Sequence, residues 1–235
     1  MRKLAARHHG LAQIAIAVAG VDTYELLRRL QRPNWPLAFE HAREIVSWER
    51  FVHIEWEPAL QSAVLRVPGL LPALDGFYFV GHFVLTGAFF LWLYRRSRPA
   101  FRVFRNGFLA TTVIALVVHR FFPTAPPRLA DVGLVHPGFG LAGLSNPVAA
   151  VPSLHAGWAL GVGIGVVRYA RPLCWRVAGA LYPPAIVLTI VATGNHFFLD
   201  ALAGMAVLGA GFAAASVLEW PLRRGVEQSG SSPGS

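Results

Sequence analysis

A histidine and an aspartate four residues apart are the side chains of this sequence best suited to chemistry. His196 and Asp200 lie in the segment Gly194-Asn195-His196-Phe197-Phe198-Leu199-Asp200. On a helix, a spacing of four residues brings two side chains to neighbouring positions on one face. A carboxylate beside an imidazole can orient the ring and stabilise the positive charge that it gains as a nucleophile. We therefore predict that His196 and Asp200 form a catalytic pair.

Four further residues could complete such a site. His155 and Ser153 lie at the start of a long apolar segment, where an ionisable side chain is costly. Arg128 follows two prolines that stiffen the chain, and Asn195 adjoins the candidate nucleophile as a possible phosphate ligand. Phosphoryl transfer needs a nucleophile, positive charge on the phosphate oxygens and a proton donor for the leaving oxygen. The sequence supplies a residue of each kind.

We expect these residues to have separate roles. His196 would attack phosphorus through one ring nitrogen, while Asp200 accepts a hydrogen bond from the other. Arg128 would bind the phosphate as a bidentate donor. Ser153 would act at the start of a helix, where free N–H groups favour an anion. His155 would protonate the leaving group and then activate the acceptor.

Each of these residues also has an ordinary structural interpretation. His155 could be a hydrogen-bonded histidine at a membrane interface, Ser153 only a helix cap, and Arg128 the snorkelling cation of a stiff turn. Their coincidence on one membrane face favours catalysis. The remaining histidines are assigned either to structural positions (His82 and His119) or to the surface (His8, His9, His41, His53 and His136). Neither a metal site nor a cofactor is expected, because the remaining carboxylates are scattered along the chain.

The composition indicates a single integral-membrane domain. The 235 residues are 54% hydrophobic and only 14% charged, with a mean hydropathy of +0.48, whereas soluble domains are about 25% charged. The net charge of +9 comes from short basic clusters between apolar runs, which is typical of membrane topology rather than of nucleic-acid binding. Cys174 is the only cysteine, so an intrachain disulfide is excluded. The first apolar run lacks a signal-peptide cleavage site and is expected to be a retained helix.

The apolar runs predict an all-α fold with six membrane spans, each near the roughly 20 residues that crossing a bilayer requires. The expected spans cover about 11–27, 76–94, 105–122, 151–167, 177–195 and 199–218. Between the first two, residues 38–65 alternate apolar and charged side chains. This pattern predicts an amphipathic helix, which Pro58 could break, lying in the bilayer interface or packed on the protein's own outer loops. Residues 1–226 would form one domain and 227–235 a flexible tail.

Basic residues predict how the spans are oriented. They gather before the first span and in alternate connections, at 95–105, 168–176 and 223–224. The positive-inside rule makes these connections cytoplasmic. The candidate catalytic residues then face the extracytoplasmic side of a cell membrane. The basic cluster at 28–32 also falls on that side, which is contrary to the positive-inside rule.

The candidate residues lie in segments that resemble the type 2 phosphatidic acid phosphatase superfamily. Pro152-Ser153-Leu154-His155 is similar to its second signature, and Gly194 through Asp200 to the end of its third. Together with Pro126-Pro127-Arg128, these segments are most similar to the inositol phosphorylceramide synthase-like branch of the superfamily. The resemblance extends over nearly the whole chain. The resemblance implies a six-helix membrane core, metal-independent chemistry through a phosphohistidine and the three catalytic roles given above.

The sequence departs from the superfamily pattern at several positions. Leu154 stands where the second signature has glycine, and Thr189 and Ile190 stand where the third has Ser-Arg. The first signature, a Lys followed by Arg-Pro, is absent as written, and Arg128 is a better replacement than Arg120. These departures fit the synthase-like branch better than the ordinary phosphatases.

Two reactions could follow from one phosphohistidine. Attack by water would make the protein a phosphatase of lipid phosphates or polyprenyl pyrophosphates. Attack by an alcohol would make it a phosphotransferase that moves a phosphorylated headgroup, of the inositol phosphate type, between lipids. A non-catalytic protein that binds or transports anionic lipids is the alternative from another class. The expected partners are a phospholipid or polyprenyl phosphate and the bilayer, with no nucleic acid and the oligomeric state left open.

Overall fold

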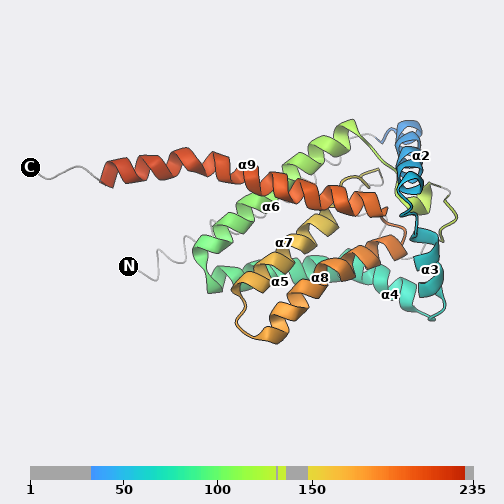
Figure 1. Cartoon of the computed structure of the whole chain (residues 1–235), viewed down its shortest axis with the longest axis horizontal. Coiled ribbons are helices and arrows are strands. Elements are labelled where there is room, and N and C mark those ends of the chain that lie inside the picture. Colours follow the sequence, from blue (N-terminus) through green and yellow to red (C-terminus); the bar gives the residue numbers. More distant parts are fainter. Residues whose placement is uncertain (1–32, 131, 136–147, 231–235) are drawn as a thin grey trace, which may run out of the picture. The chain divides into compact units, whose positions relative to one another are not determined.

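The computed structural model describes residues 33–130, 132–135 and 148–230, with side chains through Leu218 (Figure 1). Within these ranges the protein is all-helical, and its β pairing is limited to one isolated bridge between Thr124 and Ala149. The predicted span at 11–27 lies outside the described residues, as do His8, His9 and His136.

The described chain contains the following elements in order. They are α2 (Trp35–Phe51), α3 (Glu57–Leu65), α4 (Leu70–Gly76), a π-helical stretch η1 (Phe77–Gly81), α5 (His82–Arg96), α6 (Arg98–Phe121), a 3-10 turn η2 (Pro127–Leu129), α7 (Leu154–Tyr169), α8 (Leu173–Ala192) and α9 (Phe198–Gly230). The elements α4, η1 and α5 follow one another without a break, so they act as one long helical segment.

Four helical segments are long and apolar enough to cross a membrane. They are Leu70–Arg96, Arg98–Phe121, Leu173–Ala192 and Phe198–Leu218. They correspond to four of the predicted spans with shifted bounds, and they support an integral membrane protein. The predicted span at 151–167 corresponds to α7, whose 16 residues are fewer than the roughly 20 that a crossing requires. The prediction of six spans is therefore not confirmed.

Capping explains why α6 begins seven residues before the predicted span at 105. Ser97 has an extended backbone after the end of α5, and its side chain accepts a hydrogen bond from the Ala100 amide at 3.3 Å. Pro99 fits the first turn because that turn needs no N–H from it. The basic first turns of α6 are helical although they are too polar to appear in a hydropathy window.

The predicted amphipathic helix at 38–65 is two helices. The chain leaves helical geometry between Val52 and Trp56, where His53 has φ +59°. Pro58 lies in the first turn of α3, so it begins that helix rather than breaking a longer one.

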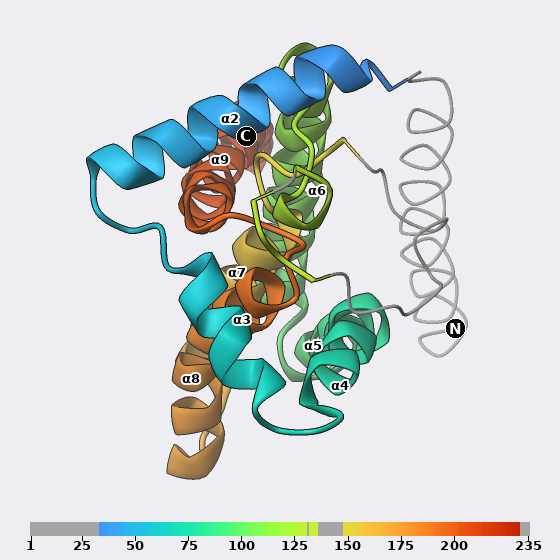
Figure 2. The same cartoon turned by 90° about the vertical axis from the view of Figure 1, so that its right-hand side faces the viewer.

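The apolar face of α2 packs on the protein's own loops and on the start of the last helix. Its residues Ala38, Ala42, Ile45 and Val46 contact a cluster formed by Ala125, Val148 and Phe197. In Figure 2, α2 crosses the ends of α6 and α9. This arrangement matches the prediction that the amphipathic segment packs on the protein's own outer loops rather than in the bilayer interface. Large apolar side chains of the same region, Trp48, Phe51 and Trp56, remain exposed.

The short helix α7 contacts α5, α6, α8 and α9. Its start meets α9 backbone to backbone, because a Cβ atom added at Gly204 would lie 2.0 Å from the Ser153 carbonyl oxygen. Only glycine permits this approach. The contact brings the beginning of α7 beside the beginning of α9, where two of the candidate catalytic residues lie.

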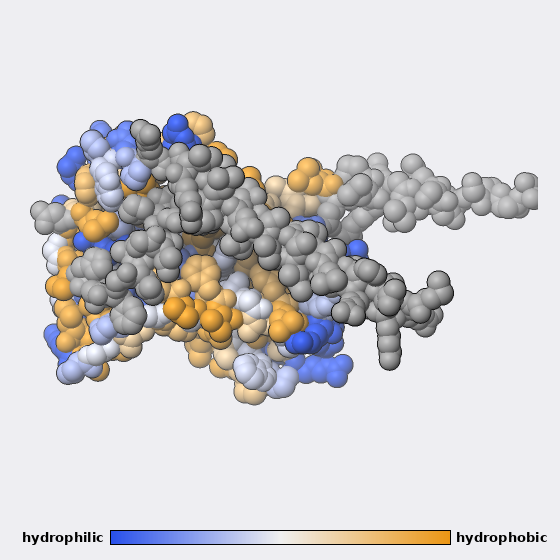
Figure 3. Space-filling model, turned by 180° about the vertical axis from the view of Figure 1, so that it is seen from behind, coloured by the Kyte–Doolittle hydropathy of each residue, from blue (hydrophilic) through white to orange (hydrophobic). Residues whose placement is uncertain are grey.

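Hydrophobic side chains gather over the middle of the helices, between hydrophilic groups toward their ends (Figure 3). This surface agrees with a bilayer environment for the long apolar segments. The last helix continues to Gly230 and so includes residues 227–230, which were predicted to belong to a flexible tail. The rest of that tail, 231–235, lies outside the described residues.

Candidate active site

His196 lies in the buried turn that joins α8 to α9. Gly194 has φ +65°, and its left-handed conformation reverses the chain directly after α8. The amides of Asn195 and His196 both donate to the carbonyl of Ile190, at 3.0 and 3.1 Å. His196 as a whole residue is 4% exposed. The turn therefore holds the candidate nucleophile in place by main-chain hydrogen bonds before α9 begins.

The structure brings His196 and Asp200 together, but not on the face of a regular helix. His196 precedes α9, whereas Asp200 lies in its first turn and folds back to accept a hydrogen bond from the Phe197 amide at 2.9 Å. The Asp200 Oδ2 atom lies 3.4 Å from His196 Nδ1. The predicted proximity is confirmed, and its cause is helix capping rather than a regular helical repeat.

The surroundings of the His196 ring distinguish its two nitrogens. Nδ1 is 2.9 Å from the carbonyl oxygen of Ala150, besides its contact with Asp200. Both neighbours are acceptors, so they favour a proton on Nδ1. Nε2 is buried and has no hydrogen-bond partner among the described residues. A neutral imidazole of this kind presents an unprotonated Nε2 that can attack an electrophile.

His155 is the ring closest to this pair from another helix. It lies in the first turn of α7, and its ring centroid is 5.8 Å from that of His196. Tyr78 stacks on it at 4.1 Å, with an interplanar angle of 29°. The Nε2 atom of His155 is also buried without a partner in the described part of the chain. Two imidazoles with available nitrogens thus lie side by side.

Arg128 is attached to the same turn by main chain and side chain. Its amide donates to the Gly194 carbonyl at 3.0 Å, and its guanidinium donates to Asn195 Oδ1. Burial lowers the pKa of Arg128, while Tyr78 and Asp75 act in the opposite direction. A guanidinium remains charged under such conditions. The structure therefore places one permanent positive charge against the turn that carries His196.

Asn195 links that arginine to a buried carboxylate. Its Nδ2 atom donates to Asp75 Oδ1 at 3.2 Å and to Thr193 Oγ1 at 2.7 Å. These two bonds orient the amide so that its oxygen faces Arg128. Asp75 was not predicted as a site residue, because a single aspartate in an apolar segment has no spacing that relates it to Asn195.

Ser153 is fully buried and caps α7. Its side chain accepts from the Ala156 amide at 3.4 Å, and its own amide donates to the carbonyl of Asp200 at 2.9 Å. Ser153 therefore has the helix-capping role that was its structural interpretation from the sequence. The same bonds tie the start of α7 to the first turn of α9, so Ser153 connects the two candidate catalytic helices.

Two buried glutamates complete the surroundings of α9. Glu57 Oε1 accepts from the Phe198 amide at 3.2 Å, and Glu49 Oε1 accepts from the Leu199 amide at 2.8 Å. With Asp200 on Phe197, three carboxylates cap three successive amides, which a helix N-terminus favours. Burial and a hydrogen bond that the protonated Glu49 carboxyl donates to Glu57 raise the pKa of Glu49 to about 9.

Sequence reasoning missed both glutamates because it assigned them to a polar, solvated face. The helical repeat of α2 separates Glu49 from the exposed Glu44, because Glu49 follows Ile45 by four residues and Val46 by three and so shares their buried face. This signal could have identified Glu49 as a buried residue. No comparable pattern marks Glu57, which is buried where it meets the start of α9.

Three of the four other described histidines have structural partners. His82 Nδ1 lies 2.9 Å from the Tyr182 hydroxyl, and His119 Nε2 lies 3.1 Å from the Pro152 carbonyl. His41 was predicted at the surface, but it stacks on Phe122 with ring centroids 3.9 Å apart. It also lies 2.7 Å from the Pro123 carbonyl oxygen. His53 is exposed as expected.

A comparison with known families finds one match. A model described as the PAP2 superfamily matches residues 43–214, a range that contains every residue of the candidate site. No curated protein and no solved structure matches the chain. In the described residues, no group of three or more His, Cys, Asp or Glu side chains could hold a metal ion.

Proposed function

Because this chain belongs to the PAP2 superfamily, we propose that it is a membrane enzyme that transfers a phosphoryl group from a lipid phosphoester to His196. Membership suggests phosphatase or phosphotransferase activity. The observation that carries the assignment of the nucleophile is the asymmetry of the His196 ring. Nδ1 faces Ala150 and Asp200, and the buried Nε2 has no partner in the described part of the chain.

The proposed reaction begins with attack of His196 Nε2 on phosphorus. A P–N bond forms, the bond from phosphorus to the ester oxygen breaks, and that oxygen leaves with the electron pair. His155 supplies a proton to the leaving oxygen. Asp200 stabilises the positive charge of the phosphohistidine through Nδ1.

The second step releases the phosphoryl group. His155, now neutral, takes a proton from the incoming water or alcohol, whose oxygen attacks phosphorus as the P–N bond breaks. Arg128 and Asn195 would bind the non-bridging oxygens throughout, and the first turn of α7 behind Ser153 would add main-chain donors. The chemistry uses side chains of this chain and requires no metal.

We further propose that the acceptor is an alcohol, so that the enzyme moves a phosphorylated headgroup from one lipid to another. The segments around His155 and His196 resemble the inositol phosphorylceramide synthase-like branch, and this resemblance supports transfer over hydrolysis. In that reaction the donor lipid loses its headgroup phosphate to His196, and the hydroxyl of an acceptor lipid receives it. The basic clusters at 95–105 and 168–176 support an extracytoplasmic site.

Product separation tests the proposal directly. The full chain in detergent would be incubated with phospholipids and polyprenyl phosphates carrying a ³²P label, in the presence of chelator and with or without myo-inositol and lipid alcohols. A new labelled lipid that requires an added alcohol supports transfer. Release of water-soluble label, as inorganic phosphate from a lipid monophosphate or as a phosphorylated headgroup from a phosphodiester lipid, would replace transfer by hydrolysis while leaving the histidine chemistry intact. Absence of any product across the panel would overturn the enzymatic proposal.

A further inference from the structure

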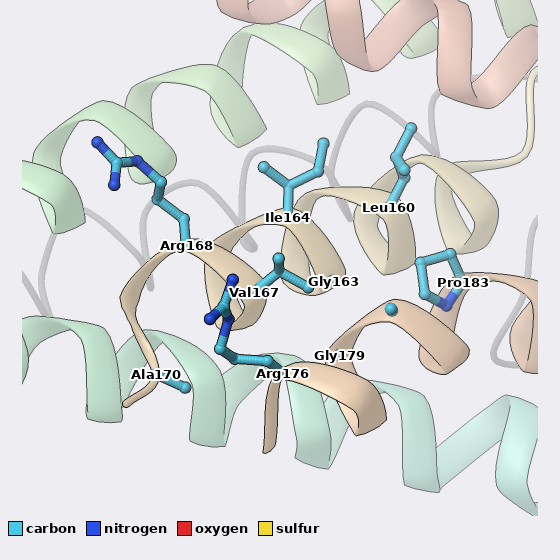
Figure 4. Close-up of a pocket in the computed structure, with 10 residues that line it drawn as sticks. Leu160, Gly163, Ile164, Val167, Arg168, Ala170, Arg176, Gly179 and Pro183 are labelled. Atoms are coloured by element: carbon cyan, nitrogen blue, oxygen red, sulfur yellow. The ribbon is translucent and has the colours of Figure 1, made fainter. Parts of the chain in front are cut away.

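A cavity of about 590 Å³ lies between α7 and α8, outside the candidate active site. This volume is within the roughly 300–1,000 Å³ that small-molecule sites occupy. Its lining is mostly aliphatic, with two arginines (Leu160, Gly163, Ile164, Val167, Arg168, Ala170, Arg176, Gly179, Ala180 and Pro183). Figure 4 shows both guanidinium groups toward the end of the cavity nearest Ala170, and Leu160 and Pro183 at the other.

The cavity lies at the opposite end of α8 from the candidate active site. Arg176 is near the beginning of this 20-residue helix, whereas His196 follows its end. A helix of that length measures about 30 Å. A headgroup bound at Arg176 therefore lies far from His196, and the cavity needs its own explanation.

Among the residues whose side chains the structure describes, none that lines the cavity is acidic. The sequence has no Asp or Glu in residues 76–130 or 132–199, which include all of α5, α6, α7 and α8. Within the described residues, neither Arg168 nor Arg176 forms an ion pair, although Arg168 lies 5.9 Å from the Tyr169 ring. Two unneutralised guanidiniums at a membrane edge favour an anion.

The apolar part of the cavity extends away from these charges along α7 and α8. Gly163 is five residues before Arg168 on α7, and Pro183 is seven residues after Arg176 on α8. At about 1.5 Å per residue, the lining continues for roughly 7–10 Å beyond the guanidiniums. A Cβ at Gly163 would lie 2.7 Å from the Gly179 carbonyl oxygen, so glycine lets the two helices meet at the floor of the cavity.

We propose that this cavity binds one phospholipid of the cytoplasmic leaflet, with its anionic headgroup on Arg168 and Arg176 and an acyl chain along α7 and α8. The combination of a basic rim with an aliphatic interior matches the two parts of such a lipid, and basic pockets between membrane helices bind anionic headgroups in general. A protein partner would match the charge but not the depth of the apolar lining. This lipid is neither donor nor acceptor in the proposed reaction.

Native mass spectrometry of the purified full chain tests the proposal with two lipids of identical acyl chains. Dioleoylphosphatidylglycerol carries the anionic headgroup, and dioleoylphosphatidylcholine carries a zwitterionic one. We expect the wild-type chain to retain the anionic lipid preferentially. The double variant Arg168→Gln/Arg176→Gln should weaken that retention roughly 25-fold, because each arginine near an anionic headgroup contributes about fivefold.

Two matched variants separate this site from general surface charge. Arg102→Gln/Arg171→Gln removes the same net charge from exposed residues that do not line the cavity, so retention should change less than about twofold. Ala180→Phe places a ring into the cavity from an exposed position and should reduce retention of both lipids. His196→Ala should retain the anionic lipid fully, which distinguishes this proposal from the proposed catalysis.

Three outcomes would overturn the lipid site. The first is equal retention of both lipids by the wild-type chain. The second is a loss of the anionic lipid in the control double variant as strong as that in Arg168→Gln/Arg176→Gln. A wild-type dimer that Ala180→Phe converts to a monomer would instead identify the cavity as a contact between two copies.

Discussion

The carboxylate of Glu49 accepts a hydrogen bond from the Leu199 amide at 2.8 Å, across 150 residues of sequence. Glu57 makes the equivalent contact with Phe198, so helices from the first third of the described chain cap the helix that follows His196. The amides at a helix N-terminus have no acceptor within the helix itself. The position of the proposed nucleophile therefore depends on residues of α2 and α3 that do not take part in the chemistry.

This contact predicts how stability changes with pH. Burial and the hydrogen bond with Glu57 raise the pKa of Glu49 from 4.5 to about 9 in the folded protein. A raised folded-state pKa gives stabilisation that is complete below the unfolded-state pKa and is lost as pH rises through the folded-state value. We expect the thermal unfolding midpoint in detergent to fall as the pH is raised from about 5 to about 9.

Glu49→Gln should flatten this dependence, because glutamine keeps an oxygen for Leu199 and cannot ionise. Glu49→Leu should instead destabilise the protein by about 1–3 kcal/mol by leaving a buried amide without its acceptor. Glu55→Gln is the matched control, since Glu55 pairs with Arg50 at 2.8 Å away from this cluster. An unchanged pH slope in Glu49→Gln would show that the ionisation of Glu49 is not the cause of this dependence.

Replacement of His196 by alanine should abolish turnover while the folded protein remains in the membrane. Loss of a nucleophile removes the covalent route, whereas loss of an interfacial hydrogen bond would only reduce stability. Asp200→Asn keeps an oxygen for the Phe197 amide but removes the charge beside the imidazole, so it should preserve the fold and slow the reaction severely. More than about a tenth of wild-type turnover in His196→Ala would contradict the assignment.

The effect of His155→Ala should depend on the leaving group. A general acid matters most for a poor leaving alkoxide and least for an activated phenolate. We therefore expect a large loss on a lipid phosphoester and a much smaller loss on an aryl phosphate, measured with the same enzyme preparation. Equal losses on the two substrates would make His155 a phosphate ligand rather than an acid.

The contacts of Asn195 predict that Asp75 controls substrate binding through Arg128. Asp75→Asn weakens the acceptor that orients the Asn195 amide, and the guanidinium then loses a fixed partner. We expect KM for a lipid phosphate and the inhibition constant for vanadate to rise roughly tenfold, with a smaller change in kcat. Thr86→Val on the same long helical segment removes a buried hydroxyl bond to His82 and provides a control for general destabilisation. An effect of Asp75→Asn confined to kcat would rule out this positioning role.

Chemical labelling can determine the side of the membrane on which the site lies. Cys174 lies near the basic connection between α7 and α8, whereas Val135 follows Arg128 and is 55% exposed. In intact cells, an impermeant maleimide should label Val135→Cys in a Cys174→Ala background, whereas Cys174 of the wild-type chain should require permeabilisation. Labelling with the reverse pattern would place the site on the cytoplasmic side.

The sequence alone determined the class of protein and part of its proposed chemistry. Long apolar runs separated by arginine clusters predicted membrane helices, because burial in lipid requires apolar side chains whatever the tertiary arrangement. The spacing of His196 and Asp200 predicted their proximity, because a separation of four residues is short enough for local structure to close it. Asn195 was named for its position next to His196, and the structure joins it to Arg128.

Only the tertiary structure determined how these residues are held. Hydropathy did not predict the true beginning of α6, which depends on a serine cap, or the break between α2 and α3. The hydrogen-bond partners of Glu49, Glu57 and Asp75 likewise could not be predicted from any local pattern, because each lies 120 or more residues away in sequence. The helical repeat of α2 places Glu49 on the buried face. The main-chain amide that makes this burial favourable is brought to it only by folding.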